Sequence, residues 1–322
     1  MSAQVCAVGE AVRLVLGLVV LGWGAAALDA GLGGARRGAG GPLRGAGGAG
    51  WWEVVRGAAG VPLGEVARLV TQRRRRTLVP DALLVRTGIV ALLLAALLAA
   101  VVLPVGEAPV LDTSVGIVWF NAMEVCVWGA LWLVGWGVNS VYPLIGGYRF
   151  LVQGLSYELP HMFALITVAL GAGSLRIADV VAAQRELWFV VWMPVAFVVY
   201  LISAAAMAFW GPLGQPLGRD VAGGVPAELA GADRLLFTIG RYALLVVVAA
   251  AAVPLFLGGG AGPVLAGWAW AAIKTVAVLC VLVLVKHRVP AVRMDRFTEF
   301  AWVVLIPLAL VQTLVVGIVV LP

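Results

Sequence analysis

Three ionisable side chains lie inside apolar stretches of the sequence, namely Glu124, Glu158 and Lys274. A charge in the hydrocarbon region of a membrane costs ~2.5–3.5 kcal/mol on insertion scales, so each is a candidate functional group. Carboxylates in a low-dielectric environment can carry protons near neutral pH, and a neighbouring lysine can change their charge state. The three residues therefore predict a proton path. The structural alternatives are a Glu124–Lys274 pair and a helix-capping role for Glu158.

Residues that bind metals or redox groups are sparse. The three cysteines, Cys6, Cys126 and Cys280, are far apart and form no CxxC pair, which argues against an iron–sulfur cluster, a zinc site or a disulfide framework. With two histidines, His161 and His287, haem ligation within the chain is not expected. The sequence contains no nucleotide fingerprint and no flavin motif. We therefore expect no metal and no cofactor bound by this chain, and any electron donor must belong to a partner.

The composition places these residues in a membrane. Hydrophobic residues make up 63% of the chain and charged residues 12%, whereas soluble domains are roughly 45–50% apolar. Such a chain cannot cover a water-facing surface. The net charge of +6 is then better explained by basic loops than by nucleic-acid binding. The predicted fold is an all-α integral membrane protein, a single membrane domain over residues 1–322 with about eight transmembrane helices.

Eight apolar stretches are long enough to span, since ~20 helical residues cross the hydrocarbon core. They cover residues 11–28, 83–105, 116–138, 159–174, 187–210, 235–257, 264–285 and 300–321. The fourth is short, which suggests a broken or tilted helix. Arginine-rich loops at 29–82 and 211–234 predict the cytoplasmic side and place both termini outside. Arg176 and Arg185 are exceptions on the outer side.

The loop 29–82 has two parts. Residues 31–50 are too rich in glycine for a stable helix. Residues 51–72 mix apolar and charged positions at helical spacing, which predicts an amphipathic helix at the cytoplasmic interface, divided at Pro62. The arginine run 73–76 would face lipid headgroups. A simple positive-inside anchor explains this run, and a specific partner contact is the alternative.

A block of spaced residues between the third and fourth predicted spans carries a family resemblance. It consists of Gly135, Trp136, Asn139, Ser140, Tyr142, Leu144, Gly146, Arg149, Gln153, Ser156, Tyr157 and Glu158. The block resembles the H-type membrane subunit of bacterial respiratory complex I, the NADH-quinone oxidoreductase, whose pattern is roughly GWxxNSxYxLxGxxRxxxQxxSYE. The sequence AGS at 172–174, LFLGG at 255–259 and the spacing of Pro290, Arg293, Asp295 and Trp302 extend the likeness from about residue 80 to the C-terminus.

The resemblance implies a multi-pass subunit of a proton-translocating NADH-quinone oxidoreductase in a bacterial plasma membrane. It implies other membrane and peripheral subunits as partners, quinone as substrate, and FMN and iron–sulfur clusters in those partners. The chain would supply part of the quinone chamber and the first stretch of the proton path, and would not be catalytic alone. The implied proton-path candidates are Glu124, Glu158, Lys274, Asp220 and Glu228. The quinone or interface candidates are Arg36, Arg37 and Arg149.

The chain departs from the family in its third cytoplasmic loop. Where the family has approximately AExNRxPFDLPE, residues 206–217 read AMAFWGPLGQPL, so the acids and the arginine are lost. The family's GEY becomes Gly240-Arg241-Tyr242, a charge inversion. These changes predict altered or lost quinone handling. Two alternatives stay open: the related membrane subunit of an energy-converting hydrogenase or formate hydrogenlyase, and a non-catalytic membrane scaffold.

Overall fold

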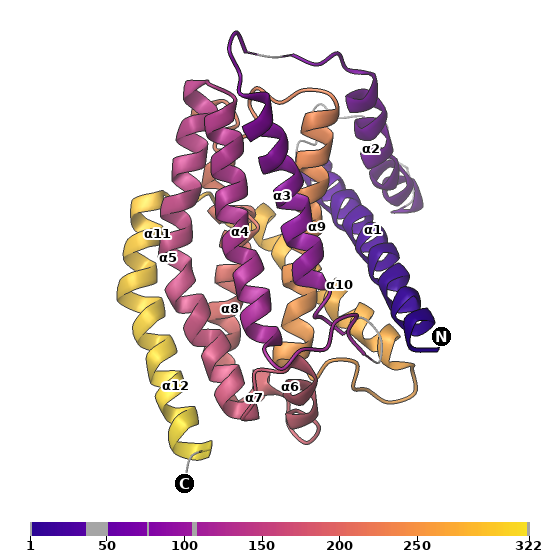
Figure 1. Ribbon diagram of the computed structural model, residues 1–322, viewed down its shortest axis with the longest axis vertical. Helices are drawn as coiled ribbons and strands as arrows, with labels where there is room; N and C mark the ends of the chain where they lie inside the picture. Colours follow the sequence, from indigo (N-terminus) through magenta and orange to yellow (C-terminus); the bar gives the residue numbers. More distant parts are fainter. Residues whose placement is uncertain (1, 37–50, 76, 105–107, 321–322) are drawn as a thin grey trace.

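The computed structural model describes residues 2–36, 51–75, 77–104 and 108–320 and contains helices but no strand within them (Figure 1). Seven helices are long and apolar enough to cross a membrane. These helices are α1 (Ser2–Arg36), α3 (Ala82–Ala100), α4 (Gly116–Gly137), α5 (Val141–Ala172), α9 (Ala232–Phe256), α10 (Gly267–Arg288) and the α11–α12 rod (Met294–Phe300 and Ile306–Val320, joined by a π-helical turn at Ala301–Leu305). The all-helical membrane fold is thus confirmed.

The remaining predicted span, 187–210, forms two shorter helices, α7 (Phe189–Trp192) and α8 (Pro194–Met207). Pro194 opens α8 because it lacks an N–H, and a first helical turn needs none there. The 14 residues of α8 extend about 21 Å. α1 begins and α12 ends at the same end of the bundle, where α6 (Ile177–Ala183) and α7 also lie (Figure 1). We call this the α6 end and the opposite one the α2 end.

Helix α5 corrects the prediction of a short fourth span. It is one helix of 32 residues, continuous through Pro160, and the family-like block lies on the end of α4 and on α5 rather than in a loop. The first half of α5 contains polar residues, and for this reason the sequence analysis did not predict it as membrane-spanning. These residues face the protein rather than lipid, and Gln153 and Ser156 are buried. Glu158 therefore lies in the middle of α5, not at its start, which excludes the capping role.

Two further boundaries differ from the sequence prediction. α1 continues to Arg36, so residues 31–36 are helical despite their glycines; residues 37–50 lie outside the described part. The predicted amphipathic helix is confirmed as α2 (Trp51–Thr71), but Pro62 does not divide it. α2 packs on α1 and α9 (Figure 1), with Leu69 1% exposed and Leu63 60% exposed. Packing against two helices outweighs the lost backbone hydrogen bond.

Glycines allow the central helices to approach closely. A Cβ on Gly88 of α3 would lie 2.6 Å from the carbonyl oxygen of Ala130 on α4, and one on Gly135 would lie 2.6 Å from that of Pro143 on α5. Small residues at such contacts are typical of membrane helix packing, in which close van der Waals contact drives association. The interface of α5 with the α11–α12 rod also has two hydroxyl pairs, Ser156–Thr298 at 2.8 Å and Thr167–Thr313 at 2.7 Å.

Arg176, which opposed the predicted orientation, is neutralised at the α6 end. Its guanidinium donates two hydrogen bonds to Asp112 in the loop between α3 and α4. These hydrogen bonds lower the pKa of Asp112. The positive-inside rule counts arginines and is little affected by acids, so Arg176 stays an exception to the predicted orientation although it is paired.

Candidate functional site: a lateral cavity and a buried polar row

A cavity of about 940 Å³ lies among α1, α2, α3, α9 and α10. Its walls are mostly apolar and include Val15, Leu18, Val19, Gly22, Trp23, Ala26, Leu69, Leu93, Leu97, Leu235, Ile239 and Ala243. Val15 and Val19 are 50% and 62% exposed, so the α1 wall reaches the outer surface of the bundle. In a membrane this surface faces acyl chains, and an apolar chain can enter the cavity laterally.

A charged cluster around Asp29 closes one region of the cavity. Both carboxylate oxygens of Asp29 accept hydrogen bonds from Lys286 Nζ at 2.7 Å, and one lies 3.0 Å from Nε2 of His287. The hydroxyl of Tyr242 donates to Asp29 at 3.2 Å. The cluster joins α1, α9 and α10, and the pairing stabilises a carboxylate that is only 16% exposed. All four residues line the cavity.

Arg241 lies beside this cluster. It donates to the carbonyl oxygen of Phe209 at 3.1 Å, and its guanidinium carbon lies 4.6 Å from the centroid of the Trp210 ring. Lys286 Nζ is 4.2 Å from the same ring. Two cations therefore contact one indole, a favourable cation–π arrangement. The inverted GRY motif and Trp210, which replaces the expected arginine, thus meet at the cavity, although Trp210 itself is not among its lining residues.

A second set of polar groups is buried between α4, α5 and α8. His161 Nε2 lies 2.9 Å from a carboxylate oxygen of Glu124, and both side chains are 1% exposed or less. The contact is not aligned as a hydrogen bond, and both ring nitrogens and both carboxylate oxygens lack a hydrogen-bond partner among the described residues. Asn121 donates to Glu158 at 3.0 Å. We call Asn121, Glu124, Glu158 and His161 the buried polar row.

His161 was missed in the sequence analysis, which used the histidines only to exclude haem. A continuous α5 provides the signal, because Glu158 and His161 are then three residues apart and share a helix face. On this face the ring also lies 5.3 Å, centroid to centroid, from Tyr200 of α8. Buried polar atoms without hydrogen-bond partners cost free energy, and they are therefore often found where a function requires them. A row of such atoms can accept and pass protons.

Lys274 does not pair with Glu124. Its ammonium donates to three backbone carbonyls, those of Leu257, Gly259 and Ala261, at 2.6, 2.9 and 2.9 Å. The ring centroid of Trp188 lies 4.2 Å away. The structural alternative of a Glu124–Lys274 pair is therefore wrong, because the loop after α9 satisfies all three donors of the ammonium.

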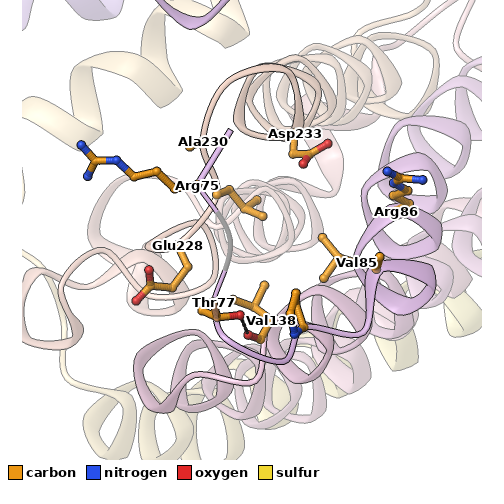
Figure 2. A pocket seen from close by; sticks show the side chains of 11 residues that line it. Arg75, Thr77, Val85, Arg86, Val138, Glu228, Ala230 and Asp233 are labelled. Carbon is orange, nitrogen blue, oxygen red and sulfur yellow. Dashed lines mark hydrogen bonds between the residues drawn. The ribbon is translucent and has the colours of Figure 1, made fainter. Parts of the chain in front are cut away.

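The remaining candidates lie at the α2 end, around loop 211–234. Arg149 on α5 contacts Asp220 at 2.5 Å, and Gln153 donates to the carbonyls of Ala206 and Leu213. Glu228 accepts from Ser140 at 3.3 Å. Glu228 also lines a small cavity of about 40 Å³ with Arg75, Arg86 and Asp233 (Figure 2). These contacts fasten the loop to α5. The side chain of Arg36 and all of Arg37 lie outside the described part.

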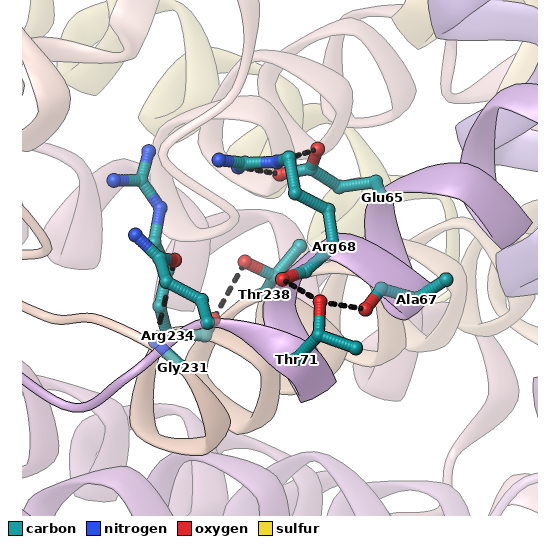
Figure 3. A network of polar contacts seen from close by, with 8 residues as sticks. Glu65, Ala67, Arg68, Thr71, Gly231, Arg234 and Thr238 are labelled. Carbon is teal, nitrogen blue, oxygen red and sulfur yellow. Dashed lines mark hydrogen bonds and ion pairs between the residues drawn. The ribbon is translucent and has the colours of Figure 1, made fainter.

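An exposed ion pair lies within the α2 helix itself. Arg68 holds Glu65 through two hydrogen bonds at 2.8 and 2.5 Å, and Arg234 and Thr238 of α9 lie on the facing helix (Figure 3). The hydrogen bonds from Arg68 lower the pKa of Glu65, which lines the cavity. The carboxylate nearest this part of the cavity is therefore already neutralised.

The Arg149–Asp220 contact predicts a pH dependence of the loop. Its hydrogen bond lowers the pKa of Asp220, so the pair stabilises the folded loop above the unfolded value of about 3.9 and this contribution is lost as pH falls through the lower folded value. We expect Asp220→Asn to increase hydrogen exchange in residues 215–225 at pH 7 and to remove the acid dependence. Asp112→Asn is the control, because Asp112 pairs with Arg176 at the α6 end, the opposite end of the bundle from this loop. Unchanged exchange at pH 7 would argue against the tether.

The fold and these features define a polytopic helical membrane protein with a lipid-facing cavity and a buried acid–imidazole row. The NADH dehydrogenase family model matches residues 54–317. An NADH-quinone oxidoreductase H subunit of Geobacter metallireducens is 36% identical over 268 residues, 80% of this chain and 81% of its own length. The corresponding H subunit of Geobacter sulfurreducens is 35% identical over the same shares. The chain belongs to the H-subunit family of NADH-quinone oxidoreductases, as the resemblance predicted.

Proposed function

We propose that this chain is the membrane subunit of a proton-translocating NADH-quinone oxidoreductase that admits the quinone and begins the proton path. One observation carries the proposal: the cavity has an apolar wall open on the α1 side and polar groups at Asp29, Tyr242 and His287. An isoprenoid quinone has the same division, with a long apolar tail and a hydrogen-bonding head. Electron transfer to the quinone requires FMN and iron–sulfur clusters in partner subunits, because the three scattered cysteines of this chain form no cluster motif.

The proton path in this proposal runs through the buried polar row. Asn121 and Glu158 lie on one side, and Glu124 and His161 continue the row between α4 and α5. Asp220 and Glu228 belong to loop 211–234 and contact Arg149 and Ser140, so their contribution is to position the loop over α5. Lys274 fixes the α6 end. Arg149 positions this loop through its ion pair with Asp220. Arg36 and Arg37 stay candidates for contact with peripheral subunits.

A pair of glycines on α1 provides the test. Gly22 lines the cavity and Gly24 does not, and an added Cβ at either position meets no atom within 4 Å. Gly22→Phe should narrow the cavity at its α1 wall and lower NADH:quinone activity of the assembled complex about tenfold, equivalent to about 1.4 kcal/mol of lost binding. Gly24→Phe, which also removes a helical glycine, should change it little.

The readout separates quinone access from assembly. NADH oxidation with a water-soluble ferricyanide acceptor reports the partner subunits and should be normal in both variants. Equal quinone activity of Gly22→Phe and Gly24→Phe would remove the cavity from the reaction. A loss of both activities in Gly22→Phe would instead indicate failed assembly, and Gly22→Leu, with a smaller side chain, then repeats the comparison.

A further inference from the structure

The cationic side chains of the cavity outnumber its acids. The charged residues in its lining are Asp29, Glu65, Arg219, Arg234, Arg241 and Lys286. Asp29 is held by Lys286, and Glu65 is held by Arg68, which lies outside the lining. No ion pair within 4 Å involves Arg219, Arg234 or Arg241 among the described residues. The lining therefore has three arginines whose charge no acid in contact balances.

Arg241 is the most restricted of the three. Arg219 and Arg234 are exposed, whereas Arg241 is partly buried and fixed by the Phe209 carbonyl and by the rings of Phe209 and Trp210. Its Nε is enclosed by the protein and has no hydrogen-bond partner among the described residues, so a head group in the cavity must approach the terminal nitrogens of the guanidinium. A guanidinium has five donors in a fixed plane and binds carboxylate or phosphate with two parallel hydrogen bonds. Such an arginine is oriented before a ligand arrives, which reduces the entropic cost of binding.

We propose that this cavity prefers an amphiphile with an anionic head group, a carboxylate or a phosphate, and that Arg241 is the residue that selects it. The inference rests on the proposed function in one respect, that the cavity takes amphiphiles from the membrane. The apolar wall from Val15 to Ala26 receives the acyl chain, and the head lies at Arg241 beside Lys286. An anionic lipid then competes with the neutral quinone for the same space and lowers quinone reduction when it is abundant.

The alternative is a structural role, in which Arg241 only stacks on Trp210. If Arg241 only stacks, any head-group preference comes from the other cations of the lining and survives the replacement of Arg241. A charge-selective role predicts that the preference follows the sign of the head group, in the order acid, alcohol, amine. The order of the three head groups on the unmodified chain tests the anion preference of the cavity, and because Arg219 and Arg234 also line it, variants at Arg241 are needed to assign that preference.

The experiment uses Trp23, which lines the cavity, as a fluorescent reporter. The full chain in nanodiscs of zwitterionic lipid is titrated with 9,10-dibromostearic acid, the matching dibromo alcohol and the matching dibromo amine, whose bromines quench nearby tryptophans. The Trp23→Phe chain gives the background from the other tryptophans. We expect the acid to reach half-maximal quenching of Trp23 at a concentration about tenfold below the alcohol, with the amine weakest.

Variants then assign the preference to Arg241. Arg241→Gln should bring the acid and the alcohol to the same half-maximal concentration, and Arg241→Lys should keep part of the difference. Arg86→Gln, an arginine outside this cavity, should leave it unchanged, and thermal unfolding of each variant checks the fold. Equal quenching by the three head groups in the unmodified chain, or a preference that survives Arg241→Gln, would overturn the proposal.

Two further titrations distinguish a phospholipid from a fatty acid as the ligand, and test quinone binding separately from the anion preference. Dibromo-phosphatidic acid that quenches Trp23 as well as the free acid identifies a phospholipid headgroup as a source, and quenching by the free acid alone identifies a fatty acid. Decylubiquinone should displace the dibromo alcohol if the cavity takes quinone. Failure of this displacement contradicts the proposed function, while the order of the three head groups continues to test the anion preference independently.

Discussion

Replacement of Glu158 by glutamine should reduce proton translocation by the assembled complex on the order of tenfold or more, because a positioned proton-transfer group contributes roughly 10²–10⁴-fold. Glutamine keeps a carbonyl oxygen that can accept the 3.0 Å hydrogen bond from Asn121, so the packing of α4 on α5 is preserved. It removes only the ability to bind and release a proton. Proton uptake by membrane vesicles, driven by NADH, is the measurement.

The control for this variant is Glu186→Gln. Glu186 is exposed at the α6 end, so its loss should leave proton uptake unchanged. Complex assembly is followed by native gel electrophoresis. Normal proton uptake in assembled Glu158→Gln would exclude Glu158 from the path, and loss of assembly with no separable coupling defect would leave it a structural role only.

Gly88→Ala should destabilise the bundle by about 1–3 kcal/mol, the usual range for overpacking. The new methyl carbon would lie 2.6 Å from the carbonyl oxygen of Ala130, 2.8 Å from a methyl of Val134 and 3.0 Å from its amide nitrogen. Two of these atoms belong to the backbone of α4 and cannot rotate away. Helices α3 and α4 must therefore move apart, and the chain in detergent should unfold at a lower temperature.

The matched control is Gly129→Ala on α4. Its Cβ meets nothing within 4 Å, and alanine favours a helix by about 0.8–1.0 kcal/mol over glycine. Tm should therefore fall in Gly88→Ala and stay level or rise in Gly129→Ala. A normal Tm for Gly88→Ala would mean that α3 and α4 are not in close contact in the membrane.

Hydropathy predicted the helices that are apolar along their whole length, and it failed where polar residues face the protein interior. α5 is the least apolar of the seven long helices, because polar residues such as Ser156, Glu158 and His161 lie on it. A membrane helix needs apolar residues only where it meets lipid, so these positions resembled a loop in the sequence. The end of α1 was also misread, because the helix continues through Gly31 and Gly33, where the glycine content had predicted a break.

The candidate site could be predicted in part. Glu124 and Glu158 were found by residue type and apolar surroundings, but their partners Asn121 and His161 depend on the contact between α4 and α5. The cavity could not be found at all, since its lining comes from five long helices and from Arg219 in loop 211–234. The ion pair Asp29–Lys286 that closes it joins residues 257 positions apart. No local pattern relates positions at that distance.

The carbonyl cage around Lys274 also concerns the ionic environment of the protein. Backbone oxygens gathered at 2.6–2.9 Å around one positive centre form the kind of shell that proteins build for potassium or sodium. Here the occupant is covalently attached to the chain, so it cannot be exchanged or diluted away. The positive charge that holds the turn after α9 thus belongs to the chain itself, and the three carbonyls need no bound cation.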